Sequence, residues 1–208
     1  MSRTIIEPMY KVLCSKDGVL LKYKRHSPED LVQDPTLKNT FLIDFEVRNL
    51  SPSINLQQFC TYNIFRLIFE VNRADAIEDL KLEERQNSSE AEMVLVFKKK
   101  GEDFGMKQKF IHLNLSLSTV PIDGTDGMTY VFECEPAYGY DGGKTMEQVH
   151  DASAVFCMSL LSPDAMRVQF MLNIPVPKVE QASYIENSLG FIMKKILART
   201  KTFIESMK

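Results

Sequence analysis

Residues 165–206 read AMRVQFMLNIPVPKVEQASYIENSLGFIMKKILARTKTFIES, and their hydrophobic period changes once. Before Pro175 the apolar residues alternate with others, which places Met166, Val168, Phe170, Leu172 and Ile174 on one face of a strand. After Pro177 the period becomes helical, and we expect one long helix over residues 179–206. Its apolar stripe comprises Ile185, Leu189, Ile192, Met193, Ile196, Leu197, Phe203 and Ile204. This combination predicts a sheet whose apolar face is covered by the helix.

Further strands precede this pair. Ser162-Pro163-Asp164 is a turn signal, so we expect the strand at 152–161 to run antiparallel to the strand at 165–175, with Phe170 and Leu172 facing the helix. Residues 107–118 alternate Leu113 and Leu115 with polar residues such as His112, which predicts one apolar and one solvent-facing side. The other expected strands are 10–14, 18–25, 41–49, 77–85, 92–100 and 128–135.

Two segments depart from the strand pattern. Ser51 followed by Pro52 predicts the start of a helix that continues through Leu56, Cys60 and Ile64. Residues 137–150 are expected to form a loop, with a short helix at 144–150 as an alternative. Because parallel crossovers need about a dozen or more residues, the short connections favour antiparallel pairing. We therefore predict an α+β fold in which a curved antiparallel sheet of seven or more strands grips a long C-terminal helix, as a single domain over residues 1–208.

The composition excludes several function classes. The net charge of −3 argues against nucleic acid as a partner. The cysteines at 14, 60, 134 and 157 match neither a zinc spacing nor a disulfide framework, so no metal and no cofactor is expected. No apolar run reaches the roughly 20 residues of a membrane span, and the N-terminus has no signal-peptide pattern. We expect a cytoplasmic monomer.

No catalytic constellation is evident. The chain has three histidines, and His112 is expected to be solvated because its alternation puts it on the polar side of its strand. Cys60 lies in an apolar stripe, where a thiol is usually inert. The glycine-rich stretches at 123–127 and 140–143 indicate turns, because neither follows a parallel strand and opens a helix. We therefore expect that the protein is not an enzyme.

The order of these motifs resembles the START lipid-transfer domains of the helix-grip superfamily. The stretch GVLLKYKR at 18–25 is similar to that family's opening strand, and Ser51-Pro52 is similar to its "A-S-P" motif. Residues 73–84 resemble the "R-x-x-W-D" segment through Arg73 and Asp75, with Ala74 where the family has Trp. Asp103-Phe104 matches the end of "R-D-F", with Glu102 in place of Arg. The resemblance ends with a final hairpin at 153–177, SAVFCMSLLSPDAMRVQFMLNIPVP, and the C-terminal helix.

The resemblance implies that a lipid, sterol or other apolar ligand binds between the sheet and the C-terminal helix, with transient contact at a membrane surface. The first alternative is a protein-interaction module in which side chains fill the same space, and an enzyme that uses the cavity, as some relatives in the superfamily do, ranks third. We expect the following residues to line the ligand cavity: Leu113, Leu115, Phe170, Leu172, Ile185, Leu189, Ile192, Met193 and Ile196. Glycines near residues 101–106 and 137–143 suit hinges, so we expect Phe104, Tyr138 and Tyr140 to form a gate over the cavity mouth.

Overall fold

A computed structural model describes residues 10–26, 29–86, 89–99, 107–124, 127–175 and 182–208. Its strands are β1 (Lys11–Lys16), β2 (Val19–Lys24), β3 (Lys38–Arg48), β4 (Ile77–Glu84), β5 (Glu90–Phe97), β6 (Gln108–Pro121), β7 (Met128–Pro136), β8 (Met146–Gln148), β9 (Ser153–Ser162) and β10 (Ala165–Pro175). Its helices are α1 (Asp30–Gln33), the short 3-10 helix η1 (Leu56–Phe59), α2 (Asn63–Asn72) and α3 (Ala182–Ser206). The predicted α+β class is confirmed.

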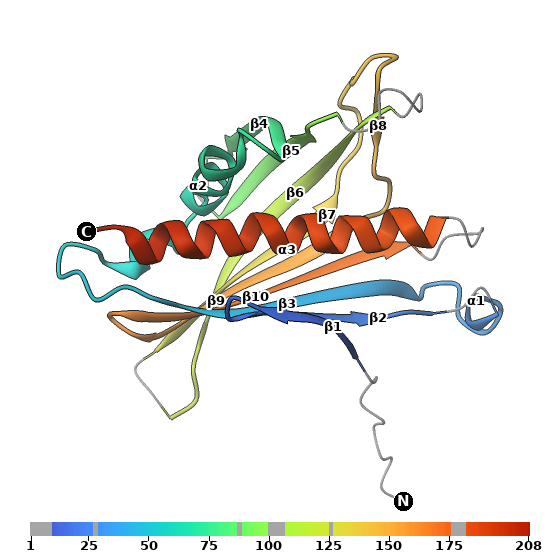
Figure 1. Cartoon of the computed structure of the whole chain (residues 1–208). Helices are drawn as coiled ribbons and strands as arrows, with labels where there is room; N and C mark the ends of the chain where they lie inside the picture. The colour runs from blue at the N-terminus through green and yellow to red at the C-terminus, as the bar shows by residue number, and fades with distance from the viewer. Residues whose placement is uncertain (1–9, 27–28, 87–88, 100–106, 125–126, 176–181) are drawn as a thin grey trace, which may run out of the picture.

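The strands form one sheet in the order β1-β2-β3-β10-β9-β7-β6-β5-β4, and the short strand β8 pairs with β6. Every pairing along this path is antiparallel, whereas β8 runs parallel to β6. Figure 1 shows α3 running across one face of the sheet, with α2 beside it near β4 and β5. The curved sheet therefore grips one long helix, as the sequence predicts.

The predicted hairpin of β9 and β10 is confirmed. The two strands are antiparallel, and Phe170 lies opposite Phe156 in their register. Phe170 and Leu172 are buried, whereas Arg167 points away from the helix and is exposed. The β1–β2 hairpin turns at Asp17 and Gly18, whose φ angles of 58° and 69° are the left-handed pair that a two-residue hairpin turn requires.

The helix predicted from Ser51 is wrong in its start and in its continuity. Residues 51–54 form a turn in which the Ile54 amide donates to the carbonyl oxygen of Ser51, and the helical structure is divided between η1 and α2. Two asparagines mark the late start: Asn49 accepts a hydrogen bond from the Ser51 amide, and Asn55 is the N-cap of η1, where its side chain accepts a hydrogen bond from the Gln57 amide. The first bond satisfies an amide outside any helix, and the cap at Asn55 starts the helical structure at Leu56 instead of at Pro52.

The alternative of a short helix at 144–150 is also wrong, because β8 occupies Met146–Gln148 there. Gln108, Lys109 and Phe110 of β6 pair with this strand. β8 thus extends the sheet beside β6, and Tyr140, which precedes it, packs against the His112 ring on the outer side, where His112 is 3% exposed. The solvated position expected for His112 is therefore wrong: the alternation placed it correctly on the outer side, but a distant segment covers that side.

Close approach to the sheet positions α3. Gly190 faces the Phe41 ring so tightly that a Cβ atom on residue 190 would lie 2.5 Å from Phe41 Cδ1. Toward the C-terminus, Asn49 Nδ2 donates to the carbonyl oxygen of Ile204 over 2.6 Å. The predicted stripe holds at Ile196, Leu197 and Ile204, which are buried, but Phe203 is 42% exposed and lies outside it. Within the described residues, no helix combines the length and apolar character needed to cross a membrane.

Candidate ligand cavity

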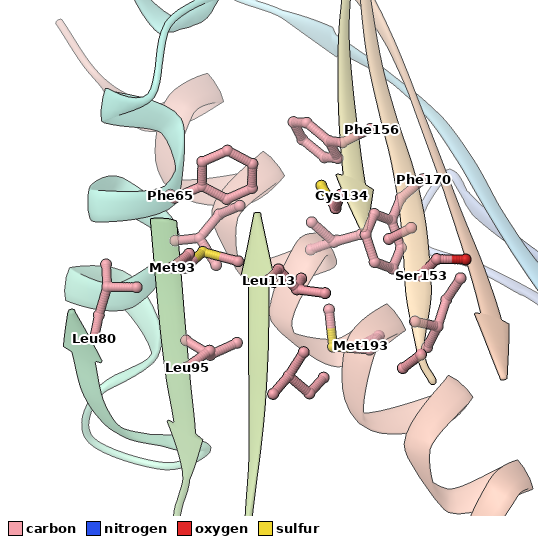
Figure 2. Close-up of a pocket in the computed structure, with 16 residues that line it drawn as sticks. Phe65, Leu80, Met93, Leu95, Leu113, Cys134, Ser153, Phe156, Phe170 and Met193 are labelled. Carbon is pink, nitrogen blue, oxygen red and sulfur yellow. The ribbon is translucent and has the colours of Figure 1, made fainter. Parts of the chain in front are cut away.

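A cavity of about 60 Å³ lies between the sheet and the two helices α2 and α3. Its described lining comes from six strands, from both helices and from the residue that precedes β9. The lining residues are Phe65, Ile68, Leu80, Met93, Leu95, Ile111, Leu113, Cys134, Ala152, Ser153, Ala154, Phe156, Phe170, Leu172, Met193 and Leu197. Figure 2 shows how these side chains converge on a shared space.

Strand register brings the wall residues together. Leu95 of β5 lies opposite both Leu80 of β4 and Ile111 of β6, which makes one row of three aliphatic side chains. Met93 lies opposite Leu113 in the next row. Because alternate residues of a strand point to the same face, these positions share the inner side of the sheet.

Aromatic rings form another part of the wall. The centroids of Phe65 and Phe156 lie 5.9 Å apart, and those of Phe156 and Phe170 lie 6.0 Å apart. Phe132, which is 0% exposed, packs edge-on against Phe65 at 5.4 Å. These are the offset and edge-to-face arrangements that aromatic pairs favour.

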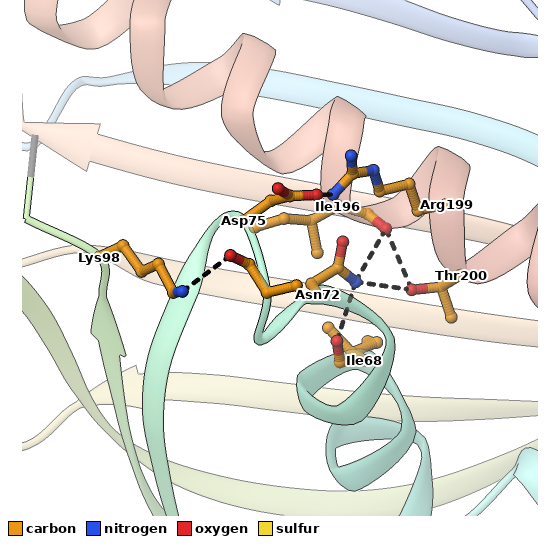
Figure 3. Close-up of polar contacts among 8 residues, drawn as sticks. Ile68, Asn72, Asp75, Lys98, Ile196, Arg199 and Thr200 are labelled. Carbon is orange, nitrogen blue, oxygen red and sulfur yellow. Dashed lines mark hydrogen bonds and ion pairs between the residues drawn. The ribbon is translucent and has the colours of Figure 1, made fainter.

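The two helices that cover the cavity are joined by a buried amide. Asn72 is 0% exposed, and its Nδ2 donates to the carbonyl oxygens of Ile68 and Ile196 over 2.8 and 3.3 Å. The same nitrogen donates to Thr200 Oγ1 over 3.3 Å (Figure 3). Asn72 therefore fixes the end of α2 against the middle of α3, one turn from the cavity residues Ile68 and Leu197.

Charged contacts surround this junction on the outside. Asp75, just after α2, pairs with Arg199 of α3, and this pairing lowers the pKa of the Asp75 carboxyl group. Lys98 Nζ donates to the carbonyl oxygen of Ala74 over 2.7 Å, which satisfies a carbonyl near the end of α2 (Figure 3). These charges face solvent and do not reach the cavity lining.

The described lining offers almost no polar group to a ligand. Ser153 lies opposite Asn173 on the outer side of the sheet, its hydroxyl accepts a hydrogen bond from Lys38, and it points away from the cavity in Figure 2. The Cys134 thiol donates to the carbonyl oxygen of Phe132, and burial raises its pKa to about 12. The cavity therefore offers an apolar ligand a hydrophobic surface and almost no hydrogen-bond partner.

The residues predicted for the cavity divide into three groups. Leu113, Phe170, Leu172 and Met193 line it. Four others pack in the surrounding core without lining it, and these are Leu115, Leu189, Ile192 and Ile196. The side chain of Ile185 lies outside the described part of the structure. On α3 the predicted Met193 and the unpredicted Leu197 line the cavity, whereas the predicted Ile192 and Ile196 do not.

The sequence prediction missed the contribution of α2 and of the edge strands. Phe65 and Ile68 lie on α2, and Leu80, Met93 and Leu95 lie on β4 and β5. Their helical spacing and alternation were signals that they are buried. Sequence periodicity does not tell which buried side chains border a cavity, because that depends on how far apart two elements pack.

The gate predicted from Phe104, Tyr138 and Tyr140 is not seen over the cavity mouth in the described residues. Phe104 lies outside the described residues. Tyr138 is 58% exposed and donates a hydrogen bond to Asp151. Tyr140 packs on Phe110 with a centroid distance of 5.2 Å, next to His112 on the outer side of the sheet. Tyr140 is therefore separated from the cavity by the sheet, and its placement over the mouth is wrong.

His112 forms a polar pair on that outer side. Its Nε2 lies 2.7 Å from Glu92 Oε1, and its Nδ1 is buried without a partner. Tyr140 covers the ring, and Lys81 lies 4.8 Å from the Tyr140 ring centroid. The imidazole is covered on this side, so a substrate has no open approach to it. Across the residues that the structure describes, no group of three or more metal-ligating side chains is found.

A second hollow is an open groove of about 660 Å³ at the end of the sheet. It lies between residues 49–57, the β9–β10 turn and Gly127, and polar side chains such as Asn55 and Asp164 contribute to its lining. Two of its leucines are exposed, Leu50 at 82% and Leu161 at 51%. The groove is therefore wetter and more mixed in chemistry than the cavity.

Known proteins are similar to this chain in structure and not in sequence. No family model matches the sequence, and neither does any curated protein. Human STARD10 superposes with a TM-score of 0.61 at 9% identity, covering 94% of this chain and 72% of that chain. The human StarD13 (DLC2) lipid transfer and protein localization domain gives 0.63 at 13% identity, covering 97% and 91%. Human StAR-related lipid transfer protein 5 gives 0.63 at 8% identity, covering 94% and 86%. The resemblance to START domains is thus confirmed as a shared fold.

Proposed function

We propose that this chain binds a lipid, sterol or other apolar ligand in the cavity between the sheet and helices α2 and α3, and that it transfers the ligand. The observation that carries the proposal is the lining, whose described side chains are apolar apart from Ser153 and Cys134 and are gathered from eight separate elements. Ligand sites in proteins are concave and mostly apolar. The fold supports the same conclusion, since similar structures include proteins named for lipid transfer.

We assign the ligand contacts to Leu113, Phe170, Leu172 and Met193, which line the cavity. The other predicted residues that the structure describes pack behind the lining side chains and support them. These are Leu115, Leu189, Ile192 and Ile196. Contact between Ile185 and the ligand stays a prediction.

In this proposal the protein acts as a carrier and not as an enzyme. The described lining supplies no acid or base apart from the Cys134 thiol, whose raised pKa of about 12 keeps it protonated. We propose that it works without a cofactor, as a monomer in the cytoplasm. Unpaired cysteines at positions 14, 60, 134 and 157 are compatible with that reducing compartment.

Transient contact with a membrane surface also belongs to this proposal. Phe191 and Phe203 of α3 are 47% and 42% exposed, and Lys195 is exposed on the same helix. Aromatic side chains favour the membrane interface, and lysines are attracted to anionic lipid headgroups. The outer side of α3 is therefore our candidate for that contact.

The alternative function is a protein-interaction module with a filled grip, and two observations favour it. The cavity volume of about 60 Å³ is well below the roughly 300–1,000 Å³ of typical ligand pockets. The larger groove at the end of the sheet exposes Leu50 and Leu161, and exposed apolar residues that cluster often mark protein-binding sites.

Native mass spectrometry of the purified protein decides between the two functions. A carrier is expected to retain co-purified ligand or to take up lipid from vesicles, and a filled grip is expected to do neither. Met193→Trp fills the cavity and should abolish uptake, whereas Leu189→Trp is the matched control, one turn earlier on α3 and outside the lining. No uptake by the parent protein, with a loss of about 1–3 kcal/mol in stability for both variants, would establish the filled grip instead.

A further inference from the structure

The two ends of the cavity differ in chemistry. At one end Phe65, Phe156 and Phe170 pack against one another, with centroid distances of 5.9 and 6.0 Å. At the other end Leu80, Leu95 and Ile111 form an aliphatic row across β4, β5 and β6. Figure 2 shows Phe65 and Phe156 on one side of the space and Leu80 and Leu95 on the other.

The aromatic end is the closed end. Phe132 lies behind it, 0% exposed, with its ring 5.4 Å from Phe65 and 6.2 Å from Phe156. A ring in such a cluster cannot move aside unless its neighbours move with it, because protein interiors are close-packed. The aliphatic end is less tightly enclosed, since Leu80 on the edge strand β4 is the one described lining residue that is only partly buried.

Neither end of the cavity offers a side-chain hydrogen bond to a polar group of a ligand. Ser153 turns its hydroxyl toward Lys38 on the outer side of the sheet, and the Cys134 thiol is engaged with the carbonyl oxygen of Phe132. A hydroxyl or carboxylate buried here would lose its water without gaining a hydrogen bond from a described lining side chain. The energetic penalty for this is far larger than any gain from the extra contact.

We propose that the cavity takes a single hydrocarbon chain, inserted tail-first, with the terminal methyl group against the Phe65–Phe156–Phe170 cluster and the polar end of the molecule outside the aliphatic row. This inference rests on the proposed carrier function and makes it specific. The ligand class is a single-chain amphiphile, selected by the length and shape of its tail and not by its headgroup. The present volume of about 60 Å³ holds only the end of such a tail, so we infer that Met93 and Met193, which line the cavity and have flexible side chains, move to admit the rest.

The aromatic cluster then sets the chain length. A tail that is too long meets the Phe156 ring, which is 2% exposed and held by three other aromatic rings. Replacing this ring by a smaller side chain deepens the cavity at its closed end. Phe156 is therefore the residue that we expect to limit the tail.

The first test compares dodecanol with the diol that carries a hydroxyl at both ends of the same chain, using displacement of a fluorescent fatty acid as the readout. We expect dodecanol and dodecanoate to bind alike, and the diol to bind at least about tenfold more weakly, because its second hydroxyl would be buried against phenylalanine rings. A diol that binds as tightly as the alcohol overturns tail-first insertion. If none of the three binds, and the protein also takes up no lipid from vesicles, the carrier function itself has failed.

The second test measures binding of straight-chain alcohols of increasing length to Phe156→Leu. We expect the preferred length to increase relative to the parent protein. Phe59→Leu is the matched control, because Phe59 is 7% exposed in the core but does not line the cavity. An unchanged optimum in Phe156→Leu, in a protein that still binds alcohols, overturns the role of the ring. An equal change in both variants does so too, because it would show a general loosening of the core.

Discussion

Substitution of Gly190 by alanine tests how closely α3 must approach the sheet. A Cβ atom on residue 190 would lie 2.5 Å from Cδ1 and 2.6 Å from Cε1 of Phe41, which are distances that no real Cβ contact tolerates. The Phe41 ring has no room to retreat, because it is 0% exposed and stacks on Tyr23 at a centroid distance of 4.4 Å. Either the helix must move away from the sheet or the paired rings must shift together.

Two effects of opposite sign determine the result. Alanine is favoured over glycine within a helix by about 1 kcal/mol, whereas overpacking a core costs about 1–3 kcal/mol. We expect the steric effect to prevail, so that Gly190→Ala lowers the free energy of unfolding in urea by about 1–2 kcal/mol. In a Phe41→Leu background the clash is relieved, and the same change should be neutral or stabilising. A stabilisation of about 1 kcal/mol by Gly190→Ala with Phe41 intact would refute the reasoning.

Three further predictions concern polar and ionisable side chains. Burial raises the pKa of the Cys60 and Cys134 thiols to about 12, so neither should react with an alkylating reagent at pH 8 in the folded protein, and mass spectrometry should find both modified only after denaturation. The Arg167 guanidinium lowers the pKa of Asp44 from 3.8, so this pair adds stability above that pH that is lost as the pH falls through the folded value. Asp44→Asn should therefore reduce the loss of unfolding free energy, measured with urea, as the pH falls below 3.8. The reduction should be less than about 1 kcal/mol because Arg167 is exposed, and an unchanged pH dependence would contradict this. Asn72→Ala should lower the free energy of unfolding by about 1–3 kcal/mol, and a change below about 0.5 kcal/mol would show that the buried amide does not hold α2 to α3.

Local patterns predicted most of the fold. The alternation in β6 and β10 and the helical stripe of α3 each reflect burial on one side of an element, which is a property that the residues carry themselves. The Asp17-Gly18 turn was predictable for the same reason, because the left-handed angles at both residues are those that this pair tolerates.

Long-range packing explains where prediction failed. His112 has the alternation of a solvent-facing residue, yet Tyr140, from a segment more than twenty residues later, covers it. Nothing within β6 could indicate that cover. The helix expected from Ser51 starts late because Asn49 satisfies the Ser51 amide outside any helix and Asn55 is the N-cap of η1, and a hydrophobic stripe indicates neither bond.

The position of the cavity follows from unequal packing along the two sides of α3. On one side the helix is drawn onto β2 and β3, where the bare backbone of Gly190 meets Phe41 and leaves no gap. On the other side α3 meets α2, and the buried amide of Asn72 holds the two helices together by their backbones. The wall beneath this second contact is built from leucine, isoleucine and methionine on β4, β5 and β6, which do not reach the helices completely. A larger side chain at residue 190 would lift α3 and disturb the cavity's cover, whereas a smaller one at Phe156 would deepen its closed end. The two substitutions therefore act on different walls of one site, and their effects on ligand binding should be separable.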